Sequence, residues 1–107
     1  MRNLIEGYNE LEKKLGYEPN FHDDNIEKVI ITIDRIELQL KTVDDIFYSL
    51  IFEDLKGTNL EGDFRFIVQL GVIFGLEIER TDDGLKTIID SSVGLFGEIT
   101  SGRIIVK

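Results

Sequence analysis

The residues best suited to chemistry lie in one short segment, which contains the single histidine of the chain. His22 could act as a general base, with Asp23 or Asp24 orienting its imidazole ring. The structural alternative is that Phe21 fills the core where a helix meets a sheet. In that case His22 and Asp23 hydrogen-bond to the loop backbone and fix its path. For an isolated His-Asp pair in a loop we favour the structural interpretation, so we assign no catalytic residue.

Most other catalytic and metal-binding sites are excluded by residues that the sequence lacks. Without cysteine there is no thiolate nucleophile, thiolate metal site or disulfide. One histidine cannot supply an HExxH zinc motif, and no GxSxG, GxGxxG or P-loop pattern occurs. Two facing carboxylates among the 21 acids would suit glycoside hydrolysis, but no tryptophan is present to line a sugar cleft. We therefore expect no enzyme activity, no bound metal and no cofactor.

The net charge of the chain indicates which kinds of molecule could bind to it. The formal net charge is −9, from 21 acidic and 12 basic side chains. It is spread evenly, since residues 1–25, 26–56 and 57–107 each carry three more acids than bases. Such a field repels nucleic acid and anionic membranes, and it accelerates encounter with a basic protein. The same charge would also keep a protein soluble without serving any partner.

Size and hydropathy predict one domain in the cytoplasm. A chain of 107 residues is in the usual range for a single domain, here residues 1–107. Hydrophobic residues make up 42% and charged residues 31%, as in globular proteins. The first residues contain no apolar run like a signal peptide, and no stretch approaches the roughly 20 apolar residues that span a bilayer.

The N-terminal residues 1–16 are expected to form a helix. Apolar residues recur there at steps of three and four and so make one stripe: Leu4, Tyr8, Leu11 and Leu15. Gly16 is a suitable C-terminal stop, and Pro19 prevents continuation. Residues 17–27 are then expected to form a loop, and residues 28–107 to be mainly β.

From residue 28 the apolar period changes to two, and its phase slips near Asp34 and Arg35. A two-residue hairpin turn at these residues explains the slip, and a β-bulge there is the alternative. The hairpin predicts three apolar pairs and one pair of like charges: Ile33 with Ile36, Ile31 with Leu38, Val29 with Leu40, and Lys28 with Lys41.

The remaining segments suggest further strands. Residues 46–52 are continuously apolar, which fits a strand or a short buried helix, and residues 57–62 resemble a loop. Residues 72–80 alternate, with Glu77 and Glu79 outward. The inward residues of this strand would be Val72, Phe74, Leu76 and Ile78.

Turn signals divide the C-terminal part. Asp83 and Gly84 predict a hairpin into residues 85–90, and residues 91–97 resemble a turn region. Ser101 and Gly102 predict a last hairpin into residues 104–106. The sum is an α+β fold, with an N-terminal helix packed on a mainly antiparallel β-sheet of about six strands.

Two segments resemble a known family. PNFHDDNIEKVIITIDRIELQLKT, residues 19–42, resembles the opening of the immunity protein 50 family of bacterial polymorphic-toxin systems. That family has a Pro-x-Phe-His-Asp loop, a strand ending in Asp-Arg and a second alternating strand. GLEIERTDDGLKTIIDSSVGLFGEIT, residues 75–100, is similar to its later part, with an Asp-Ser-Ser-x-Gly-Leu-x-Gly segment. The likeness covers residues 17–107. It departs at Asp24 and Asn25, where a small residue and an acid are more usual.

The resemblance implies a cytosolic immunity protein that binds a cognate toxin and blocks it. Phe21, His22 and Asp23 would then be family-motif residues with a structural role. No contact surface can be transferred residue by residue, so we choose outward acids beside possible apolar anchors. These candidate partner-binding residues are Glu53 and Asp54 next to Phe52, Glu61 and Asp63 next to Phe64, and Glu77 and Glu79 on one strand face.

Two other hypotheses are kept. The second is a non-catalytic structural or regulatory interaction module, such as a homodimer assembled through an open sheet edge. The third and least favoured is a small enzyme that uses His22 as its base. The first hypothesis requires a basic protein partner, the second a second copy of the chain, and the third an open pocket around His22.

Overall fold

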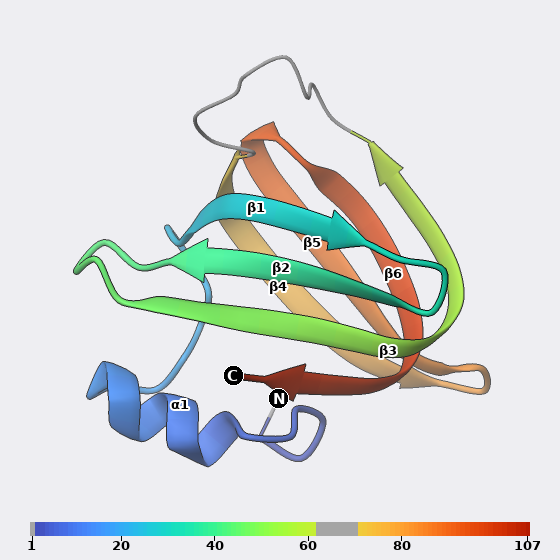
Figure 1. The fold of residues 1–107 in the computed structure, drawn as a ribbon, viewed down its shortest axis with the longest axis horizontal. Helices are drawn as coiled ribbons and strands as arrows, with labels where there is room; N and C mark the ends of the chain where they lie inside the picture. The colour runs from blue at the N-terminus through green and yellow to red at the C-terminus, as the bar shows by residue number, and fades with distance from the viewer. Residues whose placement is uncertain (1, 62–70) are drawn as a thin grey trace.

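Six antiparallel strands close into a barrel, and one short helix lies against it (Figure 1). The computed structural model describes residues 2–61 and 71–107. Around the barrel the strands run in the order β1-β2-β3-β6-β5-β4. The elements are α1 (Tyr8–Leu15), β1 (Asn25–Ile31), β2 (Arg35–Lys41), β3 (Phe47–Glu61), β4 (Gly71–Thr81), β5 (Gly84–Gly94) and β6 (Phe96–Val106).

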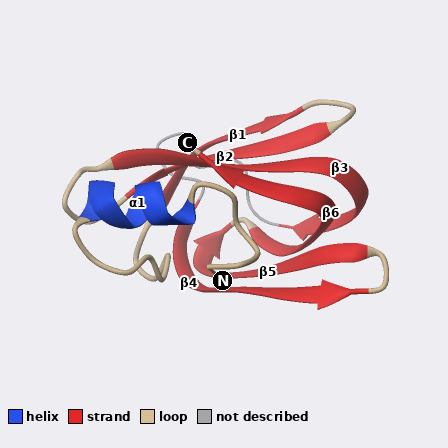
Figure 2. Cartoon of the chain, turned by 90° about the horizontal axis from the view of Figure 1, so that it is seen from below, coloured by secondary structure: helices blue, strands red, loops and turns tan. Residues whose placement is uncertain are grey.

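The fold is therefore mainly β, and the expectation of a sheet with the helix on a face or edge is only partly correct. The antiparallel pairing and the six strands are confirmed, but β1 also pairs with β4 and closes the sheet. Among the described residues this seam contains one strand pair, Asn25 with Val72. Figure 2, a view from below, shows the helix in front of the barrel, and in Figure 1 it lies below β3 and the end of β6.

The helix is shorter than the predicted 1–16. It begins at Tyr8 and ends at Leu15, where Gly16 adopts a left-handed conformation and donates its N–H to the carbonyl of Glu12. The preceding segment instead runs beside β6, since Glu6 forms a parallel bridge with Ile105. Backbone pairing with the barrel thus replaces the first helical turn, while the apolar stripe of Tyr8, Leu11 and Leu15 faces the core as expected.

The β1–β2 hairpin is confirmed, but its turn lies one residue earlier than predicted. Thr32 donates its N–H to the carbonyl of Arg35, so Ile33 and Asp34 form the turn. The Thr32 hydroxyl donates to Asp34 at 2.8 Å and so stabilises this turn. The register moves by two residues, so Ile36, Leu38 and Leu40 still face the core, whereas Ile33 lies in the turn and is exposed. The observed pairs include Ile31 with Ile36, Val29 with Leu38, and Lys28 with Gln39.

Two predicted breaks lie inside long strands. The segment 46–52 is a strand, and β3 continues through the predicted loop to Glu61. Gly102, predicted in a hairpin turn, lies within β6. β3 and β6 pair along most of their length with a bulge between Leu55 and Gly57, so partner hydrogen bonds outweigh the weak strand propensity of glycine.

The β4–β5 hairpin also differs in detail. Its turn is formed by Asp82 and Asp83, and β5 continues to Gly94, beyond the predicted 85–90. Two register shifts in β4 bring Ile73 into the core. The outward positions of Glu77 and Glu79, and the inward position of Leu76, agree with the prediction.

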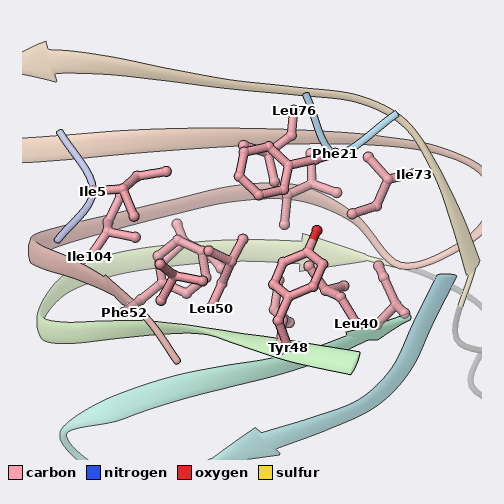
Figure 3. Close-up of a cluster of buried hydrophobic side chains, with 14 of the residues drawn as sticks. Ile5, Phe21, Leu40, Tyr48, Leu50, Phe52, Ile73, Leu76 and Ile104 are labelled. Atoms are coloured by element: carbon pink, nitrogen blue, oxygen red, sulfur yellow. The ribbon is translucent and has the colours of Figure 1, made fainter. Parts of the chain in front are cut away.

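One apolar core fills the barrel and extends to the helix (Figure 3). Phe21, Phe52, Leu40, Leu50 and Ile104 are almost completely buried. They come from the loop before β1 and from β2, β3 and β6, so the core depends on strands far apart in sequence.

Candidate functional site

The loop that contains Phe21, His22 and Asp23 closes the barrel at its seam. The Asp23 N–H donates to the carbonyl of Ile73 at 2.8 Å, and the Ile73 N–H donates to the carbonyl of Asp24 at 2.8 Å. Phe21 is only 2% exposed, and its ring centroid lies 6.2 Å from that of Tyr48 on β3. The loop therefore joins β1 to β4 by its backbone and to the core by Phe21.

The backbone of this loop is strained. Phe21 has φ 63° and Asp23 has φ 67°, which is the left-handed region that side chains other than glycine rarely adopt. The His22 N–H donates to the Asn20 side-chain oxygen at 3.0 Å, which helps to hold the turn. Such conformations persist where surrounding contacts fix them, and here these are the core and β4.

The His22 side chain lies outside the core. Its exposed fraction is 51%, and its Nδ1 atom lies 3.0 Å from the Asp23 carboxylate, which is 63% exposed. The two residues therefore meet as the sequence suggested, but on the surface. A contact so open to water is strongly screened and contributes at most about 1 kcal/mol to stability.

The neighbouring carboxylate, Asp24, points the other way. It is 6% exposed and accepts a hydrogen bond from the Tyr48 hydroxyl. Burial raises the pKa of Asp24, the Tyr48 hydrogen bond opposes that shift, and Asp23 adds to it. Burial and then Asp24 likewise raise the pKa of Tyr48. We did not predict this pair. One sign of it is in the sequence, because Asp24 is two residues before Ile26 and strand alternation places both side chains on the inner face.

A rigid turn lies close to this pair, between β2 and β3. Thr42 is 1% exposed, and its hydroxyl accepts the N–H groups of Asp44 at 3.2 Å and Ile46 at 3.1 Å. Its backbone N–H donates to Ile46, and its carbonyl accepts from Asp45, which has φ 63°. These four hydrogen bonds on one residue fix the turn in a single shape.

Exposed apolar side chains surround this turn. Val43 is 70% exposed, Phe47 60% and Tyr17 41%. Burial first, and then Asp24 and Asp44, raise the pKa of Tyr17, and the Thr42 side chain opposes that shift. We call Tyr17, Val43, Asp44, Asp45 and Phe47 the turn patch.

The helix also reaches this region. The Lys14 ammonium group donates to the carbonyl of Phe47 at 2.6 Å, which ties the C-terminal turn of α1 to the start of β3. A carbonyl group is neutral, so the ammonium group of Lys14 keeps its positive charge beside Phe47. Tyr17 follows the helix after Gly16, so the same contact limits how far it can move from the turn.

The acids predicted to bind a partner are not on one surface. Glu53, Asp54 and Glu61 belong to β3, whereas Glu77 and Glu79 belong to β4, and β6 and β5 lie between these strands. Asp63 and Phe64 fall outside the described residues.

Several of these acids already have basic neighbours. Glu53 lies 3.2 Å from Arg103, Asp54 lies 3.2 Å from Lys56, and Glu79 lies 4.0 Å from Lys86. Glu61 and Glu77 are exposed. Paired carboxylates are weaker attractors for a basic partner, so of the predicted set Glu61 and Glu77 keep the most charge available.

Within residues 2–61 and 71–107, no three histidine or acidic side chains gather in a way that could hold a metal ion. In the same part of the chain, the helix is too short and too polar to cross a membrane.

Comparison with known proteins gives no match: no family model, curated protein or solved structure corresponds to this chain. Its function therefore has to be inferred from its residues and their geometry, together with the resemblance of residues 17–107.

Proposed function

We propose that this protein is a cytosolic immunity protein, which binds a basic polymorphic-toxin domain and blocks it without catalysing a reaction. The observation that carries the proposal is a surplus of exposed carboxylates on a closed barrel. Several of them have no ion pair with any described residue: Glu10, Asp44, Glu61, Glu77, Asp82, Asp83 and Asp90.

Such a surface suits fast capture of a cationic protein. Opposite net charges steer the two proteins together over about 8 Å, the screening length at physiological salt. The strands hold their side chains on a hydrogen-bonded frame, so little flexibility is lost on binding. The resemblance to the immunity protein 50 family supplies the class of partner, a toxin domain.

The first test is capture of partners from the native cell with tagged protein, followed by mass spectrometry. We expect a basic toxin domain encoded by an adjacent gene, and inhibition of that purified toxin at a one-to-one ratio. Its association rate should fall about tenfold or more between about 50 mM and 500 mM NaCl, while dissociation changes little. If the protein is recovered alone and the neighbouring gene encodes no toxin-like protein, the proposal fails.

A homodimeric interaction module is the second candidate, and the exposed apolar side chains of Ile31 and Ile33 favour it, since a second copy could cover them. Light scattering distinguishes the two candidates. A mass of 12.3 kDa at micromolar concentration favours the monomeric inhibitor, and twice that mass favours the dimer.

A further inference from the structure

We propose that the turn patch is the surface on which the partner docks, through a basic segment that carries one apolar anchor side chain. The inference rests on the proposed function and adds the location and the chemistry of the contact. It is drawn from the exposure, charge and rigidity of residues Tyr17, Val43, Asp44, Asp45 and Phe47.

The patch concentrates exposed apolar surface. Among the described residues six large hydrophobic side chains are exposed, and three of them, Tyr17, Val43 and Phe47, belong to the patch. Phe47 points outward because Tyr48, the next residue, points into the core. Aromatic side chains of this kind are the usual energetic centres of protein interfaces.

A groove beside Phe47 offers a place for the anchor. It has a volume of about 220 Å³, and its lining includes Gln39, Phe47, Ser49 and Lys107. This volume suits one large side chain rather than a small-molecule substrate, since ligand pockets usually exceed about 300 Å³. An apolar residue of the partner could therefore lie against the ring of Phe47 with its polar neighbours at the groove edge.

The charge of the patch selects a basic partner. Asp44 has no ion pair with any described residue, and Asp45 lies 3.7 Å from Lys41. Lys41 also lies 3.3 Å from Glu27, so one ammonium group serves two carboxylates. Two cations lie near Phe47: Lys107 lines the groove, and the Lys14 ammonium group lies 2.6 Å from the Phe47 carbonyl oxygen. The negative charge of the patch is therefore that of Asp44 and Asp45 at the turn, where a lysine or arginine of the partner would meet it.

The turn patch is also preorganised for binding. The four hydrogen bonds of Thr42 fix the turn. A surface that is already ordered loses less conformational entropy on association. The β1–β2 turn, which exposes Ile33, presents one acid and one base, Asp34 and Arg35, so it has no surplus of negative charge to select a basic segment.

The test uses a defined probe, the amidated peptide Lys-Trp-Arg-Lys, titrated into isotope-labelled protein and followed by NMR. We expect shifts at the amides of residue 17 and residues 42–48, and none with the peptide Glu-Trp-Glu-Glu. Phe47→Ser and Asp44→Asn should each weaken binding about tenfold, the effect of losing one good interface contact. Shifts centred elsewhere, or no binding, would overturn the docking surface.

Matched variants make the result specific. Phe96→Ser removes another exposed aromatic ring, and Asp82→Asn removes another exposed carboxylate, so both should bind the basic peptide like the unmodified protein. Phe47 is exposed and Asp44 holds the turn by its backbone N–H, so the patch variants keep the fold.

The same variants, tested against the captured toxin, separate this inference from the proposed function. If the toxin binds Phe47→Ser and Asp44→Asn as tightly as the unmodified protein, immunity stands and the docking surface is wrong. If no toxin is captured but the basic peptide binds at the patch, the docking surface stands and the proposed function is wrong.

Discussion

The fold buries the carboxylate of Asp24, and the hydroxyl group of Tyr48 replaces part of the hydration that this carboxylate loses. It lies behind the strained Phe21–Asp23 turn and accepts the hydrogen bond of Tyr48. A buried acceptor that loses its donor retains its full desolvation cost, whereas an exposed one regains water. Side chains around Asp24 should therefore differ strongly in their effect on stability.

We expect Tyr48→Phe to lower the free energy of unfolding by about 1–3 kcal/mol, because it leaves the Asp24 carboxylate buried without a donor. Tyr17→Phe is the control, since Tyr17 is 41% exposed and water can replace its hydroxyl. Its effect should stay below about 1 kcal/mol. Urea denaturation at pH 7 measures both, and equal effects would show that the buried hydrogen bond has no special weight.

The second prediction concerns pH. Burial raises the pKa of Asp24 above 3.8, so the folded state binds the proton more tightly than the unfolded state. Its contribution to stability is fully present below that ordinary pKa and is lost as pH rises through the raised value. The free energy of unfolding of the natural protein, measured relative to Asp24→Asn, should therefore decrease from acid to neutral pH.

Glu6 provides the opposite control. Its hydrogen bond with Arg103 lowers its pKa below 4.5, so its contribution is present above that value and lost as pH falls. Relative to Glu6→Gln, the stability of the natural protein should increase from acid to neutral pH, by a small amount because the group is exposed. Slopes of the same sign for both variants would contradict the assignment.

At the scale of elements, the β3–β6 pair sets the strongest backbone constraints. Gly97 has φ 133°, and a Cβ atom there would lie 2.0 Å from the backbone carbonyl oxygen of Asn59. Gly57, in the same strand pair, has no such contact within 4 Å. Two glycines of one strand pair thus have opposite tolerance for a side chain.

We expect Gly97→Ala to destabilise the protein by about 1–3 kcal/mol or more, because the neighbouring backbone has to move. Gly57→Ala should change stability by less than about 1 kcal/mol, and in the favourable direction, since alanine loses less entropy on folding. Thermal unfolding of both variants checks this. Similar losses would mean that the close approach of β6 to Asn59 is not a constraint.

The period of the apolar residues was sufficient to predict the helix end at Gly16 and the hairpin between β1 and β2. It was insufficient where a partner strand decides the structure. Gly57 and Gly102 signal breaks locally, but both lie in strands because β3 and β6 pair across them. Ile73 enters the core through register shifts that depend on β5.

The site shows the same division. Phe21 could be predicted in the core from its place between helix and strand. The hydrogen bond of Asp24 with Tyr48 joins residues 24 positions apart and exists only because the barrel closes. The turn patch was missed because Val43 and Phe47 look like core residues in a sequence, whereas Val43 lies in the β2–β3 turn and Phe47 points outward at the start of β3.

For the whole molecule, the order of the strands controls how fast the chain can fold. β3 pairs with β6, so Leu50 pairs with Val106. The long chain segment between these two residues forms a loop that has to close before the pair can form. Closing such long loops before contacts form is slow, and folding in milliseconds to seconds is expected. Stopped-flow refolding from urea measures it, and a relaxation in microseconds would show that the distant β3–β6 pairing does not limit the rate.

The pairing of Glu6 with β6 has a mechanical consequence. Glu6 donates its N–H to Ile104 and accepts that of Val106, and its side chain contacts Arg103. The two segments run parallel, so tension applied at opposite ends of the chain pulls them past each other along their length. Both hydrogen bonds are then loaded together in shear rather than opened one after the other. The hydrogen bonds between Glu6 and β6 would therefore resist a pulling force before the strand pairs of the barrel do.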